Sequence, residues 1–124
     1  MKVIKYIIIV CFLIPILLSV HGCAEAFEKS LDNENVVLVS PSDSVNVYDS
    51  AEIFYWQPIE SSTGYELQIV TPNFDSAATL VADTTVLSNT FPLTLDSGRY
   101  QWRVRAFNNS STTVFSSPGT FTIH

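Results

Sequence analysis

Residues 97–107, SGRYQWRVRAF, hold the densest group of side chains that could do chemistry in this chain, with three arginines and three aromatic residues. Guanidinium groups interleaved with aromatic rings can bind the backbone and bases of a nucleic acid or the rings of a sugar. The same pattern also arises when a β-strand alternates between a buried face and a solvated one. The periodicity of the stretch separates these two readings.

With a strand period of two, Tyr100 and Trp102 fall on the face opposite the arginines. One face is apolar and is predicted to lie in a core: Tyr100, Trp102, Val104 and Ala106. The other is predicted to be solvated: Gln101, Arg103, Arg105 and Phe107. The arginines are therefore expected to be charge partners on a sheet face.

Two other stretches show the same division. Tyr65, Leu67 and Ile69 are predicted to point inward, and Glu66, Gln68 and Val70 outward. Phe54 and Trp56 are predicted inward, and Ile53 and Tyr55 outward. If these strands are neighbours, Glu66 is expected to pair with Arg103 or Arg105 across the sheet.

The part of the chain after residue 35 reads as short strands separated by turn residues, and no apolar spacing of helical length occurs there. Pro92 cannot donate to a ladder, so its strand is expected at a sheet edge. The fold class is therefore all-β, a seven-stranded antiparallel β-sandwich, with strands predicted at 36–39, 51–56, 65–70, 79–84, 89–95, 99–107 and 114–123.

Residues 1–22 have the layout of a secretory signal peptide. Lys2 and Lys5 precede the apolar run YIIIVCFLIPILLSV, whose 15 residues are short for a bilayer span. The following LLSVHGC resembles the lipobox of bacterial lipoproteins, although His21 replaces the usual small residue. This resemblance predicts lipidation of Cys23, which becomes the new N-terminus and inserts acyl chains into a membrane. The alternatives are an ordinary secreted protein cut after Gly22 and an uncleaved anchor.

Cleavage would leave four basic against twelve acidic residues, a net charge of −8 compared with −6 for the whole chain. An acidic chain repels phosphate backbones, so a nucleic-acid partner is not expected. Cys11 would be lost with the signal and Cys23 blocked by lipid, which leaves no thiol for a disulfide, zinc site or nucleophile. The mature length of 102 residues suits one domain.

Residues 23–35, CAEAFEKSLDNEN, are polar and acidic and are predicted to form a flexible tether. Early acidic residues after a lipidated cysteine resemble a signal for display on the outer face of the outer membrane in some Gram-negative bacteria. A solvated linker without sorting content is the alternative. The sequence thus divides into a signal at 1–22, a tether at 23–35 and a sandwich at 36–124.

The sandwich region resembles a fibronectin type III-like domain of the kind found in bacterial surface lipoproteins and carbohydrate-active enzymes. The resemblance lies in IFYWQP, GYELQIV, FPLTLDSGRYQWRVRAFN and SSPGTFTI. It implies that Trp56 is the core tryptophan of the second strand and that Tyr100 forms the family's tyrosine corner, with Leu95 before the turn. Related immunoglobulin-like sandwiches share most of these features, and the architecture hosts many unrelated roles.

No catalytic, cofactor or metal site is predicted. The only histidine of the mature chain is His124, so no triad has a positioned base. The four glycines, at 22, 64, 98 and 119, form no phosphate loop. The DNEN tract lacks the glycine and distal glutamate of a calcium loop.

Exposed aromatics are the remaining signal of a ligand, because they can stack on pyranose rings. The possible ligand-facing residues are Tyr55, Phe74 and Phe107, although each could instead be covered by neighbours. Four tripeptides resemble the O-glycosylation acceptor of some Gram-negative bacteria, with Ser44, Ser50, Ser76 and Thr84 as acceptors. NNS and NSS, at Asn108 and Asn109, fit the Asn-linked sequon.

The sequence is therefore best explained as a non-enzymatic lipoprotein, anchored through lipid on Cys23 at a bacterial cell envelope. The outer membrane, with display on the cell surface, is the expected location. Its single fibronectin type III-like domain would serve as an interaction, adhesion or spacer module with an unidentified protein or glycan partner. The alternatives are a glycan-binding protein of a polysaccharide-uptake system and the N-terminal fragment of a longer surface protein.

Overall fold

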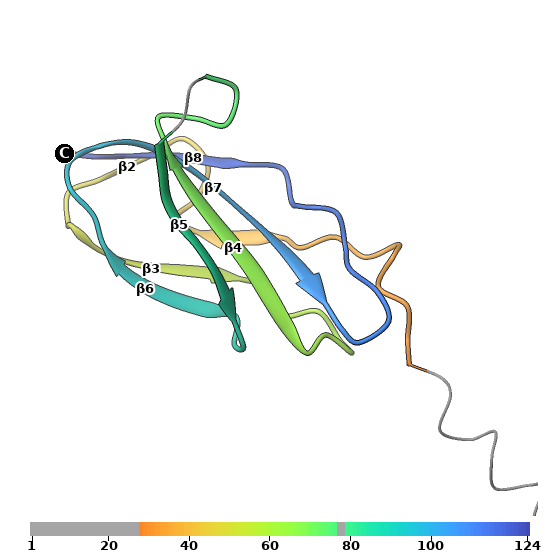
Figure 1. Ribbon diagram of the computed structural model, residues 1–124. Coiled ribbons are helices and arrows are strands. Elements are labelled where there is room, and N and C mark those ends of the chain that lie inside the picture. The colour runs from red at the N-terminus through yellow and green to blue at the C-terminus, as the bar shows by residue number, and fades with distance from the viewer. Residues whose placement is uncertain (1–27, 77–78) are drawn as a thin grey trace, which may run out of the picture.

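The computed structural model describes residues 28–76 and 79–124, which form a sandwich of two β-sheets (Figure 1). The smaller sheet has the strand order β1-β3-β6. Its strands are β1 (Leu38–Ser40), β3 (Ala51–Trp56) and β6 (Thr90–Thr94). Pro92 lies in β6 at the edge of this sheet, as predicted, where its missing N–H leaves no central ladder incomplete.

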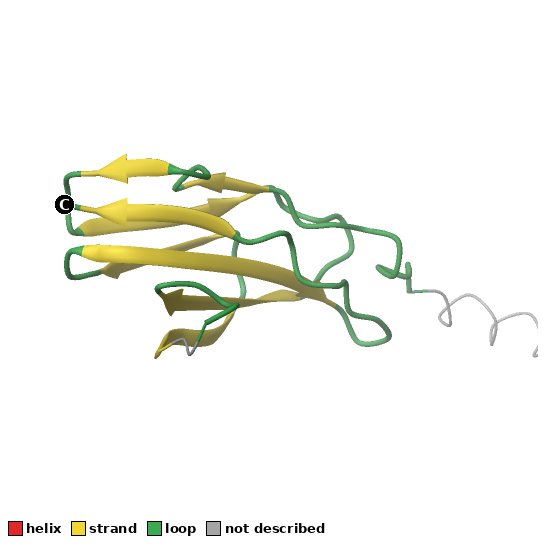
Figure 2. Ribbon diagram, turned by 90° about the horizontal axis from the view of Figure 1, so that it is seen from above, coloured by secondary structure: helices red, strands yellow, loops and turns green. Residues whose placement is uncertain are grey.

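The larger sheet has the order β2-β8-β7-β4-β5 and lies across the core from the first (Figure 2). Its strands are β2 (Val45–Val47), β4 (Gly64–Thr71), β5 (Thr79–Val86), β7 (Gly98–Phe107) and β8 (Gly119–Ile123). The long strands β4 and β7 pair antiparallel at its centre. They carry the alternating patterns that were clearest in the sequence.

The core lies between the two sheets and contains the residues that alternation placed there. Every second residue of β7 from Tyr100 to Ala106 is buried, and so are Phe54 and Trp56 of β3. Aromatic rings meet edge to face at the centre, with centroids 5.1 Å apart for Phe54 and Trp102 and 5.4 Å apart for Trp56 and Tyr65. Such pairs stabilise a core beyond the area that they bury.

The tyrosine corner predicted from the family resemblance is present. The Tyr100 hydroxyl donates to the Asp96 carbonyl over 2.8 Å, and Leu95 is buried beside the turn. Burial and the neighbouring Asp96 both raise the pKa of Tyr100, so its hydroxyl keeps the proton that this hydrogen bond needs. The corner fixes the turn from β6 into β7 and therefore the register of the arginine-bearing strand.

The prediction of seven antiparallel strands is wrong in the number of strands and in one pairing. The described residues form eight strands, because Val45–Val47 adds β2, which pairs parallel with β8. The strand predicted at 114–123 begins only at Gly119. Before it, residues 113–118 follow β7 irregularly, and Pro118 cannot donate to a regular ladder.

Val70 departs from the expected exposure, although not from the expected face. It pairs with Gln101, which lies on the outer face of β7, and it is outside the core cluster, yet it is only 4% exposed. The loop after β4 folds back toward this face, where the Phe74 amide donates to Gln101 Oε1 over 3.0 Å. The outer face of the large sheet is therefore partly covered at this end.

Residues 28–35 differ from the predicted flexible tether, because they pack against the sandwich. Leu31 is fully buried in the core cluster, and its amide donates to Ser111 Oγ over 2.8 Å. Asn108 Nδ2 donates to the Lys29 carbonyl over 2.8 Å, and the Asn109 amide donates to Glu28 Oε1 over 3.1 Å. The packed domain thus begins before residue 36.

The two ends of the described domain lie at opposite ends of the sandwich. Residue 28 (orange) is beside the β7–β8 connection, and His124 is at the far end, next to the turn between β2 and β3 (Figure 1). The His124 amide donates to the Val47 carbonyl over 2.9 Å, and its ring stacks on Tyr48. The domain therefore separates the two ends by the length of its strands.

Glu52 gives the domain a defined pH dependence. It lies half-buried on the inward side of β3, where burial and, to a smaller degree, the charge of Asp49 raise the pKa of its carboxyl above the ordinary 4.5. A carboxyl with a raised pKa in the folded state favours folding when protonated, so this contribution falls as pH rises from the ordinary pKa through the raised one. We expect Glu52→Gln to increase stability at about pH 7 by less than about 1 kcal/mol.

Urea unfolding of the parent and Glu52→Gln at neutral and acidic pH measures this effect. The difference between the two proteins should disappear below about pH 4, where both side chains are neutral. A variant that is less stable than the parent at neutral pH would show that the carboxylate makes a favourable contact instead.

Candidate interaction surfaces

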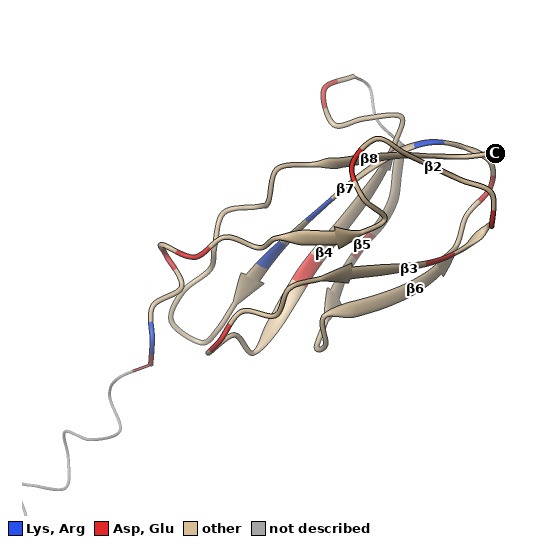
Figure 3. Ribbon diagram, turned by 180° about the vertical axis from the view of Figure 1, so that it is seen from behind, with Lys and Arg blue, Asp and Glu red and all other residues tan. Residues whose placement is uncertain are grey.

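The three arginines of the chain lie on one strand, β7, and the sequence alternation assigns them all to its outer face. Figure 3 shows the basic segments of β7 in blue. Trp102 and Val104, which alternate with the arginines, point the other way into the core, where both are fully buried. The prediction that Tyr100 and Trp102 point into the core, opposite the arginines, is thus confirmed.

Arg105 has the carboxylate partner predicted for one of the two arginines. Glu66 and Arg105 are opposite each other on β4 and β7, and Arg105 Nη2 and Nε lie 2.5 Å and 2.7 Å from Glu66 Oε2. Arg103 is opposite Gln68 and donates from Nε to Gln68 Oε1 over 2.9 Å. Of these two arginines, Arg105 forms the ion pair and Arg103 has a neutral amide partner.

Two phenyl rings stack with these guanidinium groups. Arg103 Cζ lies 4.2 Å from the ring centroid of Phe74 and 4.4 Å from that of Phe115. Arg105 Cζ lies 4.5 Å from the Phe115 centroid. Cation–π contacts of this kind join the loop after β4 and the segment before β8 to the face of β7.

Phe115 was not among the residues singled out from the sequence. It occupies the irregular part of a stretch that was predicted to be a strand, so its neighbours could not be inferred from period two. The one signal in the sequence was the group of arginines in β7, because guanidinium groups can stack on nearby aromatic rings. The stack also means that one side of the Phe74 ring is occupied by Arg103.

The three possible ligand-facing residues do not form one platform. Tyr55 is exposed on the outer face of the three-stranded sheet, beside Thr90 of β6. Phe74 and Phe107 belong to the five-stranded sheet and its loop, and the Phe107 ring covers Gly64 so closely that a Cβ there would lie 2.6 Å from Phe107 Cζ. Their role in binding a ligand stays a prediction.

The four predicted O-glycosylation acceptors differ in accessibility. Ser44, Ser50 and Ser76 are exposed in turns, whereas Thr84 is half-buried within β5. Ser76 Oγ also donates to Asn73 Oδ1 over 2.8 Å. The first two acceptors are therefore the better placed, and modification itself stays a prediction.

Asn108, the first residue of the NNS sequon, is buried, and its amide group joins three segments of the chain. Nδ2 donates to the carbonyls of Lys29 and Ser61, and Oδ1 accepts from the amide and hydroxyl of Ser111. A glycan on this nitrogen is incompatible with these contacts. Cys23, the predicted lipidation site, lies outside the described residues.

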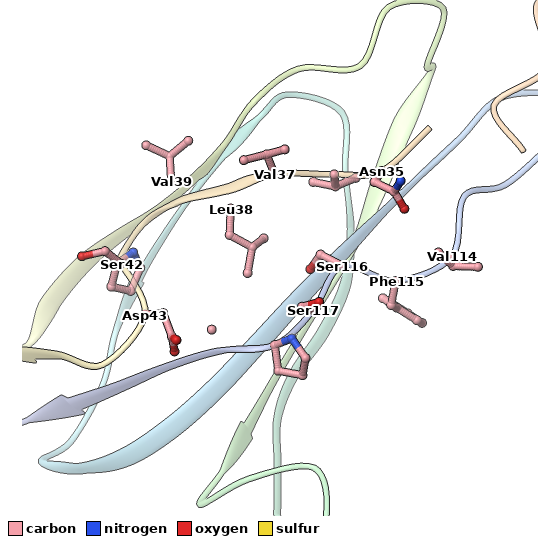
Figure 4. A pocket seen from close by; sticks show the side chains of 14 residues that line it. Asn35, Val37, Leu38, Val39, Ser42, Asp43, Val114, Phe115, Ser116 and Ser117 are labelled. Carbon is pink, nitrogen blue, oxygen red and sulfur yellow. The ribbon is translucent and has the colours of Figure 1, made fainter. Parts of the chain in front are cut away.

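A groove of about 590 Å³ runs along the seam between the two sheets (Figure 4). One wall is residues 35–39, which include the start of β1, and the other is residues 114–118, which lead into β8. Leu38 points into the groove, whereas the side chains of Val37 and Val39 point away from it on the other side of the strand. This groove was not predicted from the sequence.

Gly119 closes the floor of the groove, where β8 begins. A Cβ at this position would lie 2.9 Å from Trp102 Nε1 and 3.3 Å from Leu38 Cδ1. Asp43 is the charged residue of the lining, and its Oδ1 already accepts the Thr120 amide over 2.9 Å. The groove is therefore mainly apolar, with polar main chain along both walls.

Within residues 28–76 and 79–124, no group of three His, Cys, Asp or Glu side chains is placed to hold a metal ion. In the same ranges, no helix is long and apolar enough to cross a membrane.

Comparison of the whole fold with solved structures identifies it as fibronectin type III-like. The chain is similar to the solution structure of a fibronectin type III domain derived from human KIAA0970 protein, with a TM-score of 0.56 and 23% identity over 79% of this chain and 77% of that chain. It is also similar to the fibronectin type III domain of human fibronectin type III domain containing protein 3, with a TM-score of 0.50 and 14% identity, covering 74% and 86%. No family model and no curated protein matches the sequence.

At these identities the comparisons establish the fold and nothing further about the site. On this fold the structure places a stacked outer face on the five-stranded sheet and an open groove at the seam.

Proposed function

We propose that this chain is a non-enzymatic lipoprotein, anchored through lipid on Cys23, whose fibronectin type III-like domain serves as an interaction or spacer module at a bacterial cell envelope. The observation that carries the proposal is the separation of the domain's two ends along the strand direction. A module of this shape holds whatever follows or binds its far end away from its point of attachment.

The packing of residues 28–35 supports a close attachment to the membrane. The described domain begins at Glu28, five residues after Cys23. Five residues reach at most about 17 Å when fully extended. A lipid on Cys23 would therefore hold the end that carries the β3–β4 and β7–β8 connections near the membrane, and the end with His124 would face away.

The outer membrane, with display at the cell surface, is part of this proposal. It rests on the acidic residues that follow Cys23, of which Glu28 also contacts the domain through the Asn109 amide. Digestion of whole cells by an added protease, compared with digestion of lysed cells, measures display. Protection of the protein in intact cells would place it on an inner face instead.

Replacement of Cys23 tests the anchor. We expect Cys23→Ala to move the protein from the membrane fraction to the soluble fraction, because two or more acyl chains are needed for stable attachment and their site would be absent. Fractionation of cells followed by detection of the protein measures the change, which should involve most of the protein.

Cys11→Ala is the matched control, because Cys11 lies inside the apolar run that is removed with the signal. This variant should stay in the membrane fraction and carry lipid by mass spectrometry. If Cys23→Ala remains with the membrane as well, the apolar run itself is the anchor and lipidation of Cys23 is refuted.

A further inference from the structure

We propose that the groove between residues 35–39 and 114–118 binds an extended peptide strand from a partner protein, with aliphatic residues at alternate positions and basic residues at its ends. This inference rests on the proposed role as an interaction module, and it names the site and the chemistry of the partner. It follows from the main-chain groups, the side chains and the charge of the groove.

The wall formed by residues 114–118 is already attached to the sheet on one side only. The Ser116 amide donates to the Val104 carbonyl over 2.8 Å, and Ser116 Oγ accepts the Val104 amide over 3.1 Å. Within residues 28–76 and 79–124, the amides of Phe115 and Ser117 donate to no acceptor. This wall therefore has main-chain donors available for another strand.

Farther along the chain, β2 lies beside β8, and the same strand position continues next to residues 114–118. β2 pairs parallel with β8 from Val45 to Val47, and the Ser44 amide donates to the Thr120 carbonyl over 2.6 Å. Before Ser44 the chain leaves β8, since Leu38–Ser40 pairs with β3 in the other sheet. The groove lies where the chain has crossed to the other sheet. A bound peptide in line with β2 would therefore lie beside residues 114–118.

The side chains of the groove suit an apolar strand. Leu38 points into the groove, and Val114 at the end of the other wall is 68% exposed. Val37 and Val39 are exposed on the opposite side of their strand. The volume of 590 Å³ is within the range of about 300–1,000 Å³ typical of ligand sites. Every second side chain of a bound strand would point toward Leu38 and the floor of the groove, so aliphatic residues suit those positions.

Charge favours basic flanks on the partner. The groove interior offers only Asp43 as a charged residue among the described lining, so the contact residues of the partner should be uncharged. The chain as a whole has a net charge of −6, and the exposed Asp32 precedes the wall at residue 35, whereas Glu34 is paired with Lys29 over 3.6 Å. Lysine or arginine at the ends of the bound segment would complement this surface.

The test uses the mature lipoprotein in detergent and a defined probe, the capped peptide Lys-Val-Thr-Val-Thr-Val-Lys. Addition of the probe to about 1 mM should slow hydrogen exchange of the Phe115 and Ser117 amides by about tenfold or more. Ser117→Pro removes one of these donors, and Val114→Asp places a carboxylate at the rim. Each should weaken binding of the probe by about tenfold.

Leu87→Asp is the matched control, because Leu87 is also exposed, at 81% compared with 68% for Val114, but lies in the turn between β5 and β6. This variant should bind the probe as the parent does. A peptide with aspartate in place of both lysines should bind more weakly than the probe.

Three outcomes would overturn the proposal: no binding at about 1 mM, protection along the free edge of β5 in place of residues 115–117, or concentration-dependent protection without the probe. The last would identify a second copy of this chain as the occupant. Membrane attachment through Cys23 is measured separately, so loss of this inference leaves the proposed anchored module standing, and the reverse also holds.

Discussion

Replacing Trp56 with alanine is expected to lower the free energy of unfolding by about 3–5 kcal/mol. The side chain is fully buried at the centre of the core, where its ring meets Tyr65 at a centroid distance of 5.4 Å and Trp102 at 6.4 Å. Truncation removes these contacts and leaves a cavity that the surrounding side chains fill only in part. Urea unfolding of the variant and the parent measures the loss.

Tyr48→Ala is the control for this change, because it removes another aromatic ring without disturbing the core. Tyr48 is 80% exposed, and its ring stacks on His124 at 5.3 Å near the end of the chain. The expected loss is within about 0.5 kcal/mol. Equal losses for Trp56→Ala and Tyr48→Ala would mean that the core described here does not carry the stability of the domain.

The position of Trp56 was predictable because alternation needs only local information. In β3 and β7, and in β4 except at its two ends, residues of period two separate into a buried set and a more exposed set, since each strand has one face on the core. The Glu66–Arg105 pair followed for the same reason, because both residues occupy the outer faces of neighbouring long strands. Such features depend on the strand pattern and not on details of packing.

The short strand β2 was missed because its three residues, Val45–Val47, give too little alternation to recognise. Its partner Phe121–Ile123 lies far along the chain, and parallel pairing between distant segments leaves no local turn signal. The same difficulty explains the late start of β8. The regular strand begins only after Pro118. Before it, Ser116 is held by hydrogen bonds to Val104 of β7, a contact that local sequence does not reveal.

The candidate surfaces were predictable only in part. The outward position of the arginines followed from alternation, but the stacking of Phe74 and Phe115 on Arg103 depends on two irregular segments whose paths the sequence does not encode locally. The groove arises because the chain leaves one sheet for the other between β1 and β2. A gap of this kind is a property of the three-dimensional path, so no residue type marks it.

The N-terminal segment shows how composition can mislead. Residues 23–35 are acidic and poorly apolar on average, which predicted a flexible tether. One leucine is nevertheless enough to anchor the described part of this segment, because the polar groups around it are also satisfied. Asn108 and Ser111 supply hydrogen bonds to the backbone of Lys29 and Leu31.

Leu31→Ala is therefore expected to destabilise the domain by about 2–5 kcal/mol. Leu31 is fully buried, and its loss would also release the segment that holds Lys29 against Asn108. A total stability of about 5–15 kcal/mol is usual for a domain of this kind, so the change would remove a large part of it. Urea unfolding gives the size of the loss, and hydrogen exchange at the Asn109 amide reports the release of residues 28–35.

Leu87→Ala gives the matched comparison, because it removes the same atoms from a leucine that is 81% exposed. It should change stability by no more than about 0.5 kcal/mol. If Leu31→Ala is equally mild, residues 28–35 are a tether after all and the sandwich begins near Val36. If it is severe, the domain extends to within five residues of Cys23, and a lipid there would hold the sandwich close to the membrane surface.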